Sequence, residues 1–122
     1  MHAAADPSSL LPLSEAVLQI LLTLADGARH GYGIMREVEE RTEGRVRLGP
    51  GTLYGAVKRL RERGLIDEVA EPEVPGPGDD ERRRYYRLTP LGREVARLEV
   101  ERLARLVETA RRKRLAPEGG RP

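Results

Sequence analysis

The sequence contains no cysteine, no tryptophan and no phenylalanine, and its four aromatic residues are all tyrosines. The lack of cysteine excludes disulfide bridges, thiolate metal sites and a cysteine nucleophile. Without large aromatic side chains, a core has to be built from leucine, valine, isoleucine and alanine, which suits packed helices. A chain of 122 residues has room for one small domain and one long helix, and such a domain is often stabilised by an oligomer interface.

Membrane and catalytic signals are also missing. No apolar run approaches the roughly 18 residues that cross a bilayer, and residues 1–14 lack the basic and apolar regions of a signal peptide. We therefore expect a cytoplasmic protein without a membrane segment. Only two histidines occur, His2 near the N-terminus and His30 before a predicted helix. They form no ligand set and no catalytic constellation, so we expect no metal, no cofactor and no enzyme activity. His30 is instead expected to form a hydrogen bond at the helix start.

The charges are balanced overall but segregated along the chain. The formal net charge is +2, yet residues 37–43 are net acidic, whereas residues 58–63, 82–87 and 111–114 are net basic. Arginine clusters in an otherwise balanced protein indicate specific contacts with an anionic partner rather than general adhesion to polyanions.

Periodicity and capping residues predict four helices and one β-hairpin. Ser14 caps a first helix that ends near Gly27, and Thr89 caps a last helix with Pro90 at its first position. Two helices are expected at about residues 30–43 and 50–63. Two strands, near residues 65–71 and 83–89, enclose a loop rich in proline, glycine and acid, which we expect to be mobile.

Three short helices followed by a hairpin are the layout of a winged helix-turn-helix. The expected fold is mainly α, with a small two-stranded wing and one long C-terminal helix. The expected organisation has a disordered tail, a winged helix-turn-helix domain, a dimerisation helix and a second tail, over residues 1–9, 10–88, 89–115 and 116–122 respectively.

The helix that begins near Pro50 has the features of a DNA-recognition helix. Gly49 and Gly51 leave the positive end of the helix dipole without side chains, which suits a phosphate, although Gly-Pro-Gly also makes a tight turn between helices. Leu53 and Leu60 belong to the stripe that faces the core. The opposite face and its flanks carry Thr52, Tyr54, Gly55, Lys58 and Arg59.

Threonine, lysine and arginine contact base edges or phosphates in a major groove, and the absence of a side chain at Gly55 would let the helix approach the groove floor. The alternative is an ordinary solvated basic face.

In the hairpin, Arg82, Arg83 and Arg84 suit phosphates or a narrow minor groove. Their alternative role is to protect an edge strand by charge, and nearby acidic residues could pair with them. Of Tyr85 and Tyr86, alternation places one in the core and one partly exposed.

The first and last helices each carry two apolar stripes, more than one small chain can bury. We therefore expect a homodimer. The predicted interface residues are Leu18, Leu22, Leu98, Leu103, Leu106 and Val107. The alternatives are a solvated amphipathic helix or a helix on a membrane surface, and interspersed charges disfavour the latter.

Three segments together resemble the PadR-type winged-helix transcriptional regulators: "ILLTLADGARHGYGI", "GPGTLYGAVKRLRERGLI" and "RRRYYRLTPLGRE". The length matches the short branch with a single C-terminal helix. The resemblance implies a homodimer that binds a palindromic operator in double-stranded DNA and represses genes. A small hydrophobic or aromatic effector that relieves repression is a further expectation.

By the same resemblance, the residues that meet DNA are Tyr32, Gly51, Thr52, Tyr54, Lys58 and the wing arginines. Gly55 stands where many relatives have proline, so contacts at that point are expected to differ. Some relatives bind flat drugs between tryptophans, which this chain lacks, and no effector site is assigned. The rival function is a winged-helix module that binds a protein instead of DNA.

Overall fold

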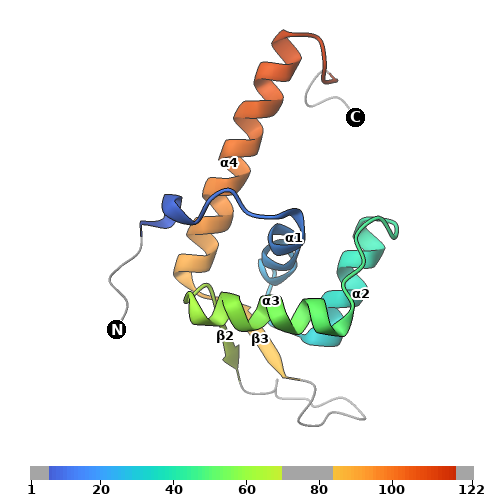
Figure 1. Cartoon of the computed structure of the whole chain (residues 1–122), viewed down its shortest axis with the longest axis vertical. Helices are drawn as coiled ribbons and strands as arrows, with labels where there is room; N and C mark the ends of the chain where they lie inside the picture. The colour runs from blue at the N-terminus through green and yellow to red at the C-terminus, as the bar shows by residue number, and fades with distance from the viewer. Residues whose placement is uncertain (1–5, 70–83, 118–122) are drawn as a thin grey trace.

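The computed structural model describes residues 6–69 and 84–117. In chain order the elements are η1 (Pro7–Leu10), α1 (Glu15–Leu24), β1 (Arg29–His30), α2 (Gly31–Arg41), α3 (Pro50–Glu62), β2 (Ile66–Val69), β3 (Tyr85–Leu88) and α4 (Pro90–Arg112). Three helices, a small antiparallel sheet and a long last helix make a winged helix fold, as the sequence predicts (Figure 1).

The helices begin at the capping residues that the sequence identifies. Ser14 Oγ accepts a hydrogen bond from the Val17 amide at 3.1 Å, and Thr89 Oγ1 accepts one from the Gly92 amide at 3.0 Å. His30 Nδ1 accepts the Gly33 amide at 2.9 Å, which confirms its predicted role at the start of α2. Each cap satisfies an amide that has no partner inside the helix.

The sheet contains one strand more than predicted. Its order is β1-β3-β2, because the two residues of β1 pair with Tyr85 and Tyr86 of β3. A two-residue strand has no periodicity of its own, so the sequence could not reveal it. Tyr86 is buried and Tyr85 is half-buried, as alternation along the strand predicts. The loop that was expected to be mobile lies outside the described residues.

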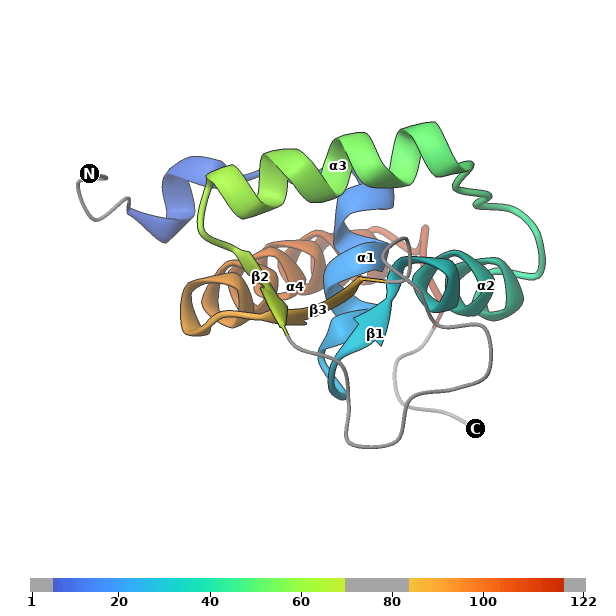
Figure 2. The same ribbon diagram turned by 90° about the horizontal axis from the view of Figure 1, so that it is seen from below.

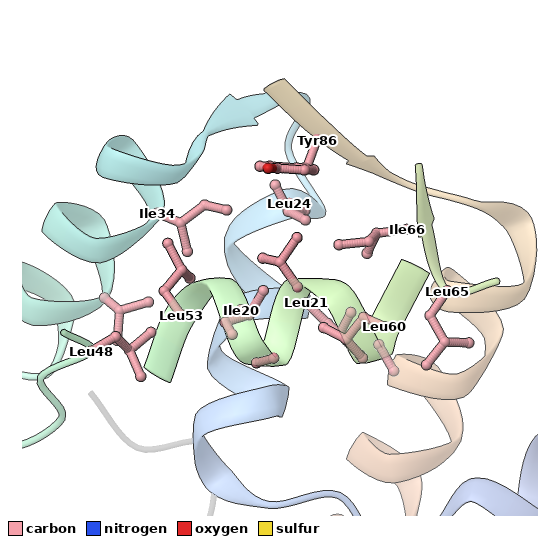
Figure 3. Close-up of a cluster of buried hydrophobic side chains, with 14 of the residues drawn as sticks. Ile20, Leu21, Leu24, Ile34, Leu48, Leu53, Leu60, Leu65, Ile66 and Tyr86 are labelled. Carbon is pink, nitrogen blue, oxygen red and sulfur yellow. The ribbon is translucent and has the colours of Figure 1, made fainter. Parts of the chain in front are cut away.

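The core is built around α1, which contacts α2, α4 and β3. Ile20, Leu21 and Leu24 of α1 are buried against apolar residues of every other major element (Figure 3). Tyr86 is the one aromatic residue in this cluster, and the rest are leucine, isoleucine, valine and alanine. Figure 2 shows α3 along the outer edge of the domain, with α1 on its inner side.

The two halves of α4 have different surroundings. Val95 and Ala96 in its first half are buried in the core, and a Cβ at Gly92 would overlap the Leu65 carbonyl oxygen. The second half, from Val100 onward, extends away from the domain (Figure 1).

Residues 7–9 belong to the segment expected as a tail, and in the structure Pro7–Leu10 form η1, which packs against α4.

Candidate nucleic-acid interface

Helix α3 is held by one face and exposes the other. Leu53, Val57 and Leu60 are almost completely buried, so rotation of the helix about its axis is fixed by the core. Two rows of side chains remain on the surface. The outer row consists of Thr52, Gly55 and Arg59, spaced i, i+3 and i+7, and the wing row consists of Tyr54, Lys58 and Arg61 beside the hairpin.

The start of α3 is bare. Gly49 is the N-cap and makes no side-chain capping hydrogen bond. A Cβ at Gly49 or Gly51 would meet no atom within 4 Å. The first amides of α3 therefore point into open space at the positive end of the helix dipole, an arrangement that suits a phosphate oxygen.

Tyr54 connects α3 to the start of α2. A Cβ at Gly31 would lie 2.8 Å from Tyr54 Cζ and would overlap the Tyr54 hydroxyl, so the ring lies directly over Gly31. A side chain at position 31 would therefore fit only if the Tyr54 ring moved away. Tyr54 remains about one-third exposed, which leaves its edge available at the surface.

Tyr32 lies at the start of α2 and is 51% exposed. Its ring stacks on His30 with the centroids 6.3 Å apart, and the Arg36 guanidinium carbon lies 6.0 Å from the ring centroid. These contacts orient the ring while leaving about half of the residue accessible. Tyr32 and Arg36 also line an open, polar hollow on α2.

The described part of the wing carries an ion-pair bridge that the sequence did not reveal. Glu68 on β2 contacts Arg84, the residue before β3, at 3.1 Å and Arg61 on α3 at 3.3 Å. Glu68 lies opposite Tyr86 in the strand register. The sequence could have indicated the contact between Glu68 and Arg84 only through a correct prediction of that register. Burial, and next to it the charge of Glu68, raises the pKa of Tyr86 above its usual value. Arg82 and Arg83, and the acidic residues proposed to pair with them, lie outside the described residues.

Helices α2 and α3 differ in whether their cations form ion pairs. Among residues 6–69 and 84–117, Lys58 and Arg59 on α3 have no ion pair and no side-chain hydrogen bond, and the same holds for Arg63 directly after it. Both arginines of α2 are paired: Arg36 contacts Glu40, and Arg41 reaches Gln19, Thr23 and Glu37. Helix α3 also carries the exposed Glu62, so its net charge is +2, and Lys58 and Arg59 are the two cations of the helix without an ion pair in this part of the chain.

The predicted interface residues surround an apolar surface shared by α1 and α4. Leu22, Leu106 and Val107 are exposed, Leu106 to 55%. Leu18, Leu98 and Leu103 are half-buried. Val100, which was not among the predicted interface residues, is also exposed on α4. A monomer leaves this surface in water, and such patches commonly mark interaction sites.

A cleft of about 320 Å³ lies between α1 and α4. Leu13, Leu18 and Leu103 supply its apolar walls. The buried carboxylate of Glu99 lies beside it and accepts two hydrogen bonds from Arg102, both at 2.8 Å, and one from the Leu13 amide at 3.3 Å. The hydrogen bonds from Arg102 hold the pKa of Glu99 below its usual value.

The described residues (6–69 and 84–117) hold no cluster of three histidine, cysteine, aspartate or glutamate side chains that could bind a metal. In the same part of the chain, no helix combines the length and the apolar character needed to cross a bilayer.

Comparisons with known proteins identify the family. A protein of 37.1 kDa in transposon Tn4556 of Streptomyces fradiae is 40% identical over 93 residues, which cover 76% of this chain but only 24% of the Streptomyces protein. The transcriptional regulator Rv3488 of Mycobacterium tuberculosis is 39% identical over 93 residues, which cover 74% of this chain and 79% of the regulator.

A solved structure has the same fold. The PadR family transcription regulator of hypervirulent Clostridium difficile R20291 superimposes with a TM-score of 0.68 at 26% identity, over 81% of this chain and 97% of that protein. The model of the PadR-like transcriptional regulator family matches residues 20–98, which include the second half of α1, all of α2 and α3, the described strands and the first part of α4. The chain therefore belongs to the PadR-like family of transcriptional regulators, whose members bind DNA.

Proposed function

We propose that two copies of this chain form a regulator that inserts its two α3 helices into neighbouring major grooves of a palindromic operator. The observation that carries the proposal is the surface of α3, where Lys58 and Arg59 have no acidic partner and the helix start is bare. A major groove about 12 Å wide accepts one helix, and lysine and arginine there contact phosphates and base edges.

The residues around α3 extend this surface to the DNA backbone. Thr52 and Gly51 lie in the first turn of α3, where amides and a hydroxyl are suited to phosphate oxygens. Tyr32 lies at the start of α2, and Gly31 beside it is covered by Tyr54 of α3. The hydroxyl of Tyr32, a residue that is half exposed, is suited to a second phosphate. Arg84, with Arg82 and Arg83, would lead the wing along the backbone towards a minor groove.

The pairing of two chains is proposed to use the apolar surface of α1 and α4. The second half of α4 leaves the domain and carries Val100, Leu106 and Val107 to the surface, while Leu22 lies exposed on α1. In an isologous dimer, the same surface of each chain packs against the other, so these residues would be covered in both copies. Two α3 helices related by a two-fold axis would then meet half-sites about 34 Å apart, one turn of the duplex.

The proposed mode is repression, in which the bound dimer covers a promoter. A small hydrophobic or aromatic effector would relieve it by binding between α1 and α4, where the cleft walled by Leu13, Leu18 and Leu103 lies next to the proposed dimer surface. A ligand there that favours one orientation of α4 would change the spacing of the α3 helices and hence the DNA affinity.

The test combines DNA selection from a random pool with sedimentation of the purified chain. A palindrome with half-sites one turn apart, bound by a dimer with an affinity that falls steeply with salt, is the expected result. A chain that dimerises but binds no DNA in a salt-dependent way would instead be a protein-interaction module. A stable monomer would overturn the proposed architecture.

A further inference from the structure

Gly55 is an interior helix residue whose lack of a side chain has no structural explanation. It lies in the middle of α3, where glycine destabilises a helix relative to alanine. A Cβ at this position would meet its nearest neighbour at 3.6 Å, an ordinary van der Waals contact. Gly31 and Gly92 differ, since a Cβ there would overlap neighbouring atoms. Packing therefore disfavours a side chain at those two positions but not at position 55.

The neighbour of that Cβ position is Nη1 of Arg59. Side chains of a helix lean towards its N-terminus, and Arg59 follows this rule by placing its guanidinium beside Gly55, one turn nearer the start of α3. Its side chain has neither an ion pair nor a hydrogen bond within residues 6–69 and 84–117. The five N–H donors of the guanidinium are therefore open on the outer row.

The other cations of α3 are less suited to base recognition. Arg61 is paired with Glu68 at 3.3 Å. Lys58 has no acidic partner, but an ammonium group is a point charge without the planar fork that pairs with two acceptors. Arg63 is the C-cap of α3, at the opposite end from the bare helix start. Arg59 alone combines an open guanidinium with a position on the same face as Thr52.

We infer that Arg59 reads a guanine in each half-site, and that Gly55 provides the bare helix surface beside which its guanidinium reaches the base. This inference rests on the proposed binding of α3 in a major groove. Guanine presents O6 and N7 as two acceptors on its groove edge, and arginine binds both at once. A side chain at position 55 would stand between the helix and the base edges on the same row.

The experiment is DNA selection with wild-type protein, followed by affinity measurements on the selected site and on a site with the symmetric guanine pair replaced. For the wild type, the replacement should weaken binding at least about thirtyfold, because one bidentate contact is lost in each of the two half-sites. Arg59→Ala should bind both sites equally, and Arg59→Lys should keep part of the affinity but lose most of the discrimination. Melting temperature and sedimentation must be unchanged, because Arg59 contacts nothing that holds the fold.

Lys58→Ala is the matched control, because it removes a neighbouring unpaired cation from the same helix. It should weaken binding to both sites by the same factor and reduce the salt dependence by about two counterions, one for each α3 of the dimer, while the discrimination against the replaced site stays intact. Gly55→Ala should raise the melting temperature by a few degrees and lower affinity for the selected site more than for the replaced site.

Two failures can be told apart. If the wild type selects no DNA sequence, the proposed function fails, and the inference fails with it. If the wild type selects a palindrome but Arg59→Ala keeps every base preference, α3 binds DNA without base recognition by Arg59. That second result overturns the inference and leaves the proposed function in place.

Discussion

Helices α2 and α3 are similar in length but differ in net charge, which is −1 for α2 and +2 for α3, and in how their cations are paired. Helix α2 (Gly31–Arg41) satisfies its two arginines inside the protein, through Glu40 and through the side chains of α1. Helix α3 (Pro50–Glu62) leaves two of its three cations, Lys58 and Arg59, without a partner. Counting charges along the sequence gives the two helices opposite signs, but it does not show which cations of α3 lack a partner.

Under the proposed function, unpaired cations mark the binding surface in addition to its net positive charge. A paired surface cation has already lost much of its attraction for a phosphate, because the carboxylate beside it repels the same phosphate. An unpaired cation on a helix fixed by its core face keeps the full attraction. The comparison predicts that mutations in α2 change stability and that mutations in α3 change DNA binding.

The largest effect is expected for the double substitution Lys58→Ala/Arg59→Ala. It removes one phosphate contact and one base contact from each α3, so the DNA affinity should fall at least about a hundredfold, which is roughly 2.7 kcal/mol. The melting temperature should stay the same. Fluorescence anisotropy on the selected operator measures the loss. An affinity within threefold of wild type would remove α3 from the interface.

The counterpart in α2 is Arg41→Ala. Arg41 Nη2 donates to Gln19 Oε1 at 2.8 Å and to Thr23 Oγ1 at 2.9 Å, across the α1–α2 contact. Loss of these partly exposed hydrogen bonds should lower the free energy of unfolding by about 1 kcal/mol and the melting temperature by about 4 to 8 °C. DNA affinity below the melting transition should change by less than twofold. A large affinity loss without destabilisation would contradict the division between the helices.

A smaller effect is expected where the two helices touch. The methyl group of Gly31→Ala would overlap the Tyr54 ring, so the ring must turn away, at a cost of about 1 kcal/mol. In a Tyr54→Ala background the same change should cost almost nothing, and the coupling between the two substitutions measures the contact. Gly55→Ala is the matched glycine control in α3, and it should raise stability by about 0.5 kcal/mol. Denaturant unfolding compares all four variants.

Local signals in the sequence predicted the helices and their starts. Ser14, His30 and Thr89 cap the predicted helices, and the apolar repeat of α3 faces the core. These features depend on residues within one or two turns of each other, so a single sequence contains them.

The parts that were missed depend on contacts between distant residues. The pairing of β1 with β3 joins residues 29–30 to residues 85–86. The ion-pair bridge of Glu68 requires the hairpin register together with the rotation of α3. The packing of Tyr54 on Gly31 likewise depends on the distance between two helix axes. None of these contacts has a local pattern, which explains why the sequence located helix α3 but not the partner of Arg61 and Arg84.

The smallest effect is expected for Glu68→Gln, which keeps the shape of the side chain and removes the charge that holds Arg61 and Arg84. Exposed ion pairs contribute at most about 1 kcal/mol, so stability should change little. Arg61 would become available to phosphates, and DNA affinity should rise about two- to threefold at low salt, with a steeper salt dependence.

Asp67→Asn is the control, because Asp67 is an exposed neighbour on β2 without an ion pair in the described part of the chain. It removes the same amount of negative charge without releasing an arginine. If Asp67→Asn raised the affinity as much as Glu68→Gln, net charge near the duplex would account for both results. A gain confined to Glu68→Gln would show that Arg61 is restrained by its ion pair with the wing, which extends the contrast between paired and unpaired cations to a second position of α3.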